Sequence, residues 1–143
     1  MARTPEFGAG VDTSLLVRLL TGRPEALAAA AKEFLAEMES AGAPVFVSDL
    51  VVAEAYFACQ HHYGIPKGDV LRGLHELLAQ PTFQVPEDLL ELLSRPGPDT
   101  AEPGFLDRLI HAEYARSGLP LVSFEKAAAR LPDTRVLAPG SSS

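Results

Sequence analysis

Short apolar runs alternate with helix-like segments along almost the whole chain, and this alternation constrains the fold more than any other feature. Five runs have the length and composition of strands rather than helices: 8–11, 44–47, 82–85, 119–124 and 135–138. Strands that are separated by helices predict a parallel sheet with helices on both faces. We therefore expect an α/β fold in which helices sandwich a parallel central sheet of four to five short strands.

The segments between these runs carry helix signals. Apolar spacing, caps and helix breakers predict helices over 13–20, 24–40, 49–63, 69–79, 86–93 and 105–116, with a short helix over 125–131. The Pro- and Gly-rich stretch 94–104 predicts a loop. We expect one domain over residues 8–138, with flexible ends at 1–7 and 139–143.

The length and the net charge of the chain argue against several classes of protein, among them membrane-spanning proteins and proteins that coat nucleic acid. A chain of 143 residues fits one domain, and no apolar run approaches the length of a membrane span. The single cysteine, Cys59, cannot form an internal disulfide, which fits a reducing cytoplasm or an oxidising compartment in which the protein needs no disulfide. The net charge of −7 disfavours a protein that simply coats nucleic acid. A nucleic-acid partner would require metal ions or local basic patches.

Two acidic residues follow directly on predicted strands. Asp12 ends the first apolar run, and Glu125 comes after "LVSF". In parallel α/β sheets, ligands bind outside the carboxyl ends of the strands. Both carboxylates are therefore candidates for a functional site.

Two further acids share helix faces with apolar side chains. Leu50, Glu54 and Phe57 lie on one face of their predicted helix, at i, i+4 and i+7. Asp107 shares a face with Ile110 in the helix over 105–116. We expect these faces to pack inward and to place both carboxylates in apolar surroundings.

Four acids gathered in this way would repel one another, and burial would add a desolvation cost. A divalent cation offsets both effects, and carboxylate oxygens are the ligands that Mg²⁺ or Mn²⁺ prefers. Without metal, we expect at least one of these carboxyl groups to have a pKa above its free value.

Four stretches of the chain resemble a known family. "VDTSLL", "SDLVVAEAYF", "FLDRLIHAEYA" and "LVSFE" are similar to the four acidic motifs of PIN-domain ribonucleases, in the usual order. "VVAEAYFACQHHYGIP" resembles the second motif of the VapC-type toxins of bacterial toxin–antitoxin pairs. The resemblance covers residues 8–138. It implies a compact α/β sandwich that cleaves RNA with Mg²⁺ or Mn²⁺.

The resemblance also implies site residues. It gives four acids the shared role of metal ligand and catalytic carboxylate: Asp12, Glu54, Asp107 and Glu125. Three nearby hydroxyls would hold those carboxylates by hydrogen bonds: Thr13, Ser14 and Ser123. The bound cation would neutralise phosphate charge and activate a water for hydrolysis. A cognate antitoxin that inserts a cationic side chain among the acids, and a homodimer of this chain, follow from the same resemblance.

The chain departs from the family pattern at two places. The fourth acidic position carries Glu125, where the family usually has Asp, and a longer side chain alters the reach of the carboxylate. Gly104 stands where relatives often have a second Asp before the third motif. Glu125 at the fourth position keeps open an alternative, a catalytically weak PIN-like module that binds protein or RNA.

Each acid also has an ordinary explanation. Asp12 could cap the following helix, with Thr13 and Ser14 as rival caps. Glu54 could pair with a nearby base, and Asp107 and Glu125 could be first-turn acids that the helix dipole favours.

Other chemistry-bearing residues predict less. Cys59, His61 and His62 lie on one predicted helix without a second ligand pair, which argues against zinc. His111 could touch substrate or lie at the edge of the core. Three cations near the acids could meet an RNA backbone or be simple surface charges: Arg108, Lys126 and Arg130.

Overall fold

Five short parallel strands divide into two sheets. β1 (Ala9–Gly10), β2 (Val45–Phe46) and β3 (Phe83–Gln84) form a sheet in that order, and β4 (Leu121–Ser123) pairs with β5 (Thr134–Val136). The computed structural model, which describes residues 8–94 and 103–139, confirms the α/β class and the parallel pairing. The expected single sheet is instead split three and two. The predicted flexible end 1–7, most of the opposite end and most of the loop 94–104 lie outside the described residues.

Helices occupy most of the described chain. They are α1 (Thr13–Thr21), α2 (Glu25–Ala41), α3 (Asp49–His61), α4 (Lys67–Leu78), α5 (Leu89–Ser94), α6 (Phe105–Arg116) and the 3₁₀ helix η1 (Lys126–Arg130). The helix predicted over 105–116 has those bounds in the structure, whereas the helix predicted from residue 86 begins later, at Leu89. Across the described ranges, no helix is both long and apolar enough to span a bilayer.

Local hydrogen bonds fix where the helices beside the site begin and end. The Asp12 side chain caps α1, and the Ser48 hydroxyl caps α3 by accepting from the Val51 backbone N–H at 3.2 Å. Gly22 ends α1 in the left-handed region, at φ 69°, where its N–H donates to the Arg18 carbonyl. Glycine adopts this conformation without the penalty that a Cβ atom brings.

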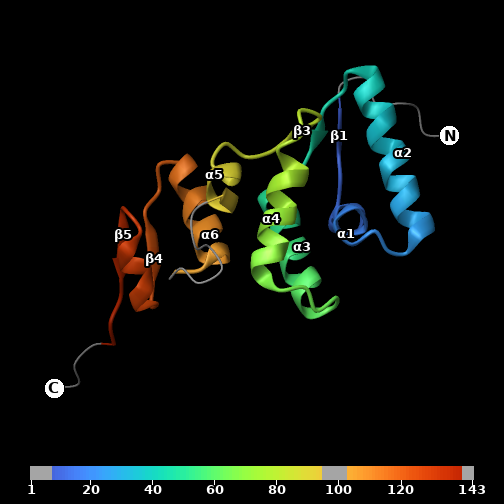
Figure 1. Cartoon of the computed structure of the whole chain (residues 1–143). Coiled ribbons are helices and arrows are strands. Elements are labelled where there is room, and N and C mark those ends of the chain that lie inside the picture. Colours follow the sequence, from blue (N-terminus) through green and yellow to red (C-terminus); the bar gives the residue numbers. More distant parts are fainter. Residues whose placement is uncertain (1–7, 95–102, 140–143) are drawn as a thin grey trace.

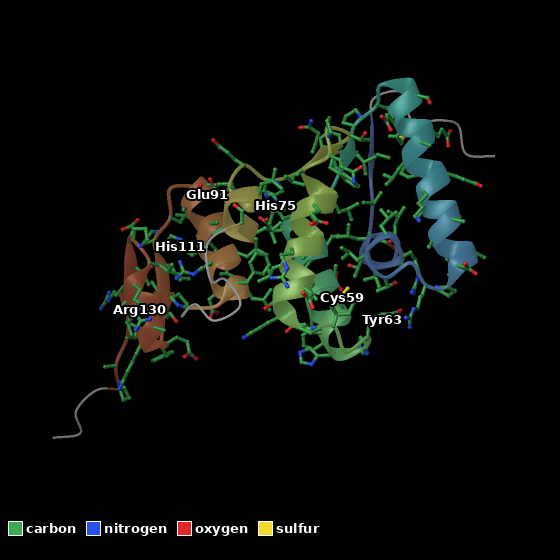
Figure 2. The ribbon with its side chains drawn as sticks, in the orientation of Figure 1. Cys59, Tyr63, His75, Glu91, His111 and Arg130 are labelled. Carbon is green, nitrogen blue, oxygen red and sulfur yellow. The ribbon has the colours of Figure 1, made fainter. Side chains whose placement is uncertain are left out.

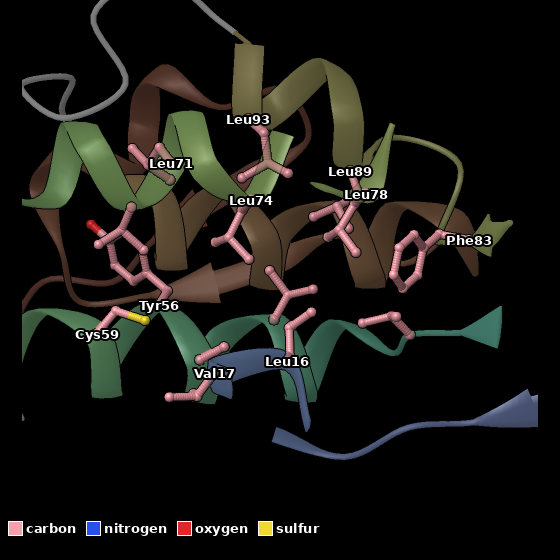
Figure 3. Packing of buried hydrophobic residues seen from close by; sticks show 14 of the residues in the cluster. Leu16, Val17, Tyr56, Cys59, Leu71, Leu74, Leu78, Phe83, Leu89 and Leu93 are labelled. Atoms are coloured by element: carbon pink, nitrogen blue, oxygen red, sulfur yellow. The ribbon is translucent and has the colours of Figure 1, made fainter. Parts of the chain in front are cut away.

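The core is built mainly from α1, α3, α4, α5 and α6, and Figure 3 shows part of it. Leu16 of α1, Val52 of α3 and Leu74 of α4 are completely buried, and Leu89 of α5 is almost so. Burying one such side chain stabilises the fold by about 1.5–3 kcal/mol. Because α1 and α3 meet through this core, the residues at their N-terminal ends are held in a fixed relation.

The elements are arranged around a central pair of helices (Figure 1). α3 and α4 lie in the middle, with β1, α1 and α2 on one side and α6, β4 and β5 on the other. An ion pair between Arg116 of α6 and Asp49 of α3 links the C-terminal part to the centre. This layout decides which of the predicted site residues can meet.

Candidate functional site

Asp12 stands at the junction of β1 and α1. Its carboxylate accepts hydrogen bonds from the Ser14 hydroxyl at 2.6 Å and from the Leu15 backbone N–H at 3.3 Å. The Ser14 bond, followed by the Leu15 bond, lowers the pKa of Asp12 from its ordinary value. Asp12 is therefore not a carboxyl group with the raised pKa that was expected of at least one of the four acids. Asp12 is the cap of α1, while Ser14 and Thr13 are not.

Glu54 is linked to the same junction. Thr13 Oγ1 donates a hydrogen bond to Glu54 Oε1 at 3.1 Å, across 41 residues of sequence. The hydroxyls of Thr13 and Ser14 thus hold two different carboxylates, those of Glu54 and Asp12. The start of α1 and the middle of α3 together present two acids whose orientations are fixed.

A hollow of about 560 Å³ opens beside this junction. Its lining residues end the three strands of the first sheet or follow them directly: Gly10, Val11, Phe46, Val47, Ser48, Gln84, Val85 and Pro86. Asp12 is the next residue after Val11. The hollow therefore lies at the carboxyl ends of parallel strands, where α/β sheets bind ligands.

Asp107 and Glu125 lie on elements of the C-terminal part. Asp107 is an exposed acid in the first turn of α6. Glu125 is exposed at the cap position of η1, where its side chain makes no cap hydrogen bond, and its backbone N–H donates to Ser123 Oγ at 2.9 Å. The Ser123 hydroxyl thus meets a backbone group there rather than a carboxylate.

A comparison with known protein families shows to which family this chain belongs. The PIN domain family matches residues 10–133 of the 143-residue chain, a range that includes all four acids. The chain belongs to the PIN-domain family. PIN domains have a nuclease-type fold, and many are ribonucleases. Searches of curated proteins and of solved structures gave no match.

The four acidic side chains of this PIN domain are of the type that binds a hard cation. The described structure does not bring enough of them together to form a metal site. Carboxylate oxygens fit Mg²⁺ or Mn²⁺. Within residues 8–94 and 103–139, however, no three Asp, Glu, His or Cys side chains gather in a group that could hold a metal ion. In Figure 1, α6 and β4 lie across α3 and α4 from β1. Among the described residues, the hydrogen bond from Thr13 to Glu54 links the first two acidic motifs.

The two acid-bearing helix faces point outward rather than inward. Leu50 is 69% exposed and Phe57 is 51% exposed, so the face they share with Glu54 meets solvent. Ile110, which shares a face with Asp107, is 47% exposed. The expected inward packing of both faces is wrong.

The core instead takes the opposite face of α3, with Val52, Ala55, Tyr56 and Cys59. Apolar residues surround α3 almost completely, so the periodicity identifies which residues share a face but does not choose the buried one.

Among the described residues, the thiol and imidazole groups do not gather in a set of three that could hold a metal ion. Cys59 is buried, and burial raises the pKa of its thiol. His61 and His62 are exposed at the end of α3. His111 makes a 2.7 Å hydrogen bond between Nε2 and the Pro132 carbonyl, as expected of a residue at the edge of the core.

The sequence patterns missed two contacts. Arg18 Nη1 donates to Tyr63 Oη at 2.7 Å, which joins the end of α1 to the chain just beyond α3. Arg116 pairs with Asp49, whose other carboxylate oxygen is buried without a hydrogen-bond partner in the described part of the chain. An acid in a first turn and a base in a last turn are the signals that could have marked the second pair.

Proposed function

We propose that this PIN-domain protein is a divalent-metal-dependent endoribonuclease. The observation that carries the proposal is the Thr13–Glu54 hydrogen bond, which joins the first and second acidic motifs beside the carboxyl-end hollow. The match to the PIN family over residues 10–133 and the four acids in motif order support it.

The residues of the chain suit this chemistry in part. A bound cation supplies positive charge for the phosphate and an activated water. Asp12 and Glu54 are held by hydroxyl hydrogen bonds before any ligand arrives, which lowers the cost of orienting them. Asp107 lies on α6 and Glu125 follows β4, across α3 and α4 from β1.

RNA cleavage tests the proposal directly. Purified protein with Mg²⁺ or Mn²⁺ should cleave single-stranded or structured RNA, and EDTA should stop the cleavage. Asp12→Asn and Asp107→Asn should abolish activity while the far-ultraviolet circular dichroism stays unchanged. Full activity in both variants would exclude these acids from the reaction.

The biological role that we propose is that of the toxin of a type II toxin–antitoxin pair, active as a homodimer in the cytoplasm. The net charge of −7 and the exposed carboxylates of Asp12 and Glu54 favour a partner that presents Arg or Lys side chains. The double variant Asp12→Asn, Asp107→Asn should then bind the antitoxin more weakly without losing the dimer. Unchanged affinity would place inhibition elsewhere on the surface.

One observation favours a second candidate function. Since no group of three metal-binding side chains forms in the described ranges, the chain could serve as a binding module with little catalysis. A Mn²⁺ titration separates the two, because a cation that binds only the folded state must raise the melting temperature. No shift together with no RNA cleavage would favour the module.

A further inference from the structure

Aromatic and cationic side chains gather at the C-terminal end of α3. We define the aromatic corner by five residues: Arg18, Phe57, His61, His62 and Tyr63. The Phe57 and His61 rings lie 4.2 Å apart between centroids at 36°, and the His62 ring stands edge-on to Phe57 at 6.5 Å. Phe57 and Tyr63 are both exposed. Figure 2 shows Tyr63 at this end of the molecule, far from His111 and Arg130.

The charge around this corner differs from that of the whole protein. The chain carries −7, yet residues 13–24 and 55–68 contain no Asp or Glu. These segments supply Arg18, Arg23, Lys67 and the two neighbouring histidines. Within these two segments an anion meets no carboxylate, whereas Glu54 lies one helical turn before Phe57 on α3.

The aromatic corner is continuous with the candidate site. Glu54, Phe57 and His61 lie on one exposed face of α3, at i, i+3 and i+7. Two helical turns, about 10 Å, separate the carboxylate position from the His61 position. At one end Thr13 of α1 bonds Glu54, and at the other Arg18 of α1 bonds Tyr63. The carboxylate of Glu54 and the rings of Phe57 and His61 therefore lie along one face of α3, and α1 makes a hydrogen bond near each end of this face.

We propose that the aromatic corner binds the single-stranded part of an RNA substrate and positions its backbone beside Asp12 and Glu54. The proposal rests on the ribonuclease function proposed above. Unpaired bases stack on aromatic and imidazole rings whatever their sequence. Arg18 uses Nη1 for Tyr63 and for the Arg23 carbonyl, and its other N–H groups donate no hydrogen bond to the described residues. Those groups can donate to a phosphate.

Binding of labelled RNA in EDTA tests this without cleavage. The probes are 5′-fluorescein-labelled uridine and adenosine decamers, read by fluorescence anisotropy. Phe57→Ala should weaken binding of both by at least about fivefold, the loss expected from one stacked base. Phe57→Tyr, which keeps the ring, should bind within about twofold of wild type. Leu27→Ala removes an equally exposed apolar side chain, 54% exposed on α2, and should change nothing.

The charge contribution has its own pair of variants. Arg18→Gln should weaken binding and reduce the slope of log affinity against log salt by about 0.7, the value for one phosphate contact to a single strand. Arg72→Gln on α4 removes a cation that Asp69 already pairs, and it should leave the slope unchanged. If the slope of log affinity against log salt is the same in wild type, Arg18→Gln and Arg72→Gln, Arg18 does not contact a phosphate.

The outcomes separate this proposal from the ribonuclease function. RNA binding that depends on Phe57, without any cleavage in Mg²⁺ or Mn²⁺, supports the corner and rejects the nuclease. Cleavage by Phe57→Ala and His61→Ala with wild-type KM and wild-type RNA affinity rejects the corner and keeps the nuclease. A lower mass of Phe57→Ala in light scattering, with unchanged RNA affinity, would make this face a contact between copies and overturn the proposal. No binding and no cleavage by wild type would reject both.

Discussion

Thr13 Oγ1 donates a hydrogen bond to Glu54 Oε1 at 3.1 Å, and this contact fixes a carboxylate of α3 against the first turn of α1. We predict that Thr13→Val lowers RNA cleavage about two- to tenfold, the equivalent of one lost hydrogen bond. Thr13→Ser keeps a hydroxyl and should retain most activity. Because the contact is exposed, neither variant should shift the melting temperature much. Wild-type kcat and KM in Thr13→Val would show that the orientation of Glu54 does not matter.

The charge of Asp12 makes stability depend on pH over a defined window. The folded pKa of Asp12 lies below its ordinary value of 3.8, because Ser14 and Leu15 donate to the charged form. The ionised group therefore stabilises the fold above that ordinary value, and this stabilisation is lost as pH falls through the folded pKa. Asn also caps helices, so Asp12→Asn should fold normally and remove only this pH dependence.

Melting temperatures of wild type and Asp12→Asn, measured from pH 7 down to pH 2, check the sign. We expect a constant difference above about pH 5 that closes as pH falls below about 4. The other carboxyl groups are common to both proteins and cancel in the difference. A difference that grows toward acid pH would contradict the lowered pKa. Asp12→Ala, which removes the cap as well, should melt below Asp12→Asn at neutral pH.

The role of Glu125, which stands where the family usually has Asp, can be tested by substitution. Glu125 is exposed and makes no side-chain cap bond at η1, so its replacement should leave folding intact. If the carboxylate serves the reaction, Glu125→Gln should lower kcat at least about tenfold, while Glu125→Asp should keep part of it. Cleavage by Glu125→Ala at the wild-type rate would show that the fourth acid is unused.

The sequence predicts the elements of this fold better than their assembly. Local signals act within a few residues, and so the helix over 105–116 was predictable. Pairing of strands is a long-range choice that periodicity does not encode. The division of β1–β3 from β4–β5 was therefore not predictable from the apolar runs.

The candidate site shows the same limit. The motif pattern identifies Asp12 and Glu54, which one junction brings together. It did not predict that Leu50 and Phe57 would face solvent, because α3 is apolar on nearly every side. Arg18 and Tyr63 carry no motif at all, and only the packing of α1 on α3 reveals their contact.

The link between α6 and α3 gives the last prediction. The side chains of Arg116 and Asp49 are 25% and 13% exposed, and one oxygen of Asp49 is buried without a partner among the described residues. Arg116→Gln leaves that carboxylate poorly compensated and should lower the free energy of unfolding by about 1–3 kcal/mol. Adding Asp49→Asn removes the buried charge and should restore part of the loss. Arg72→Gln breaks a largely exposed i,i+3 pair with Asp69 and should cost less than about 0.5 kcal/mol. Urea unfolding of the four proteins measures these values. Equal losses for Arg116→Gln and Arg72→Gln would show that the Arg116–Asp49 pair does not hold α6 against α3.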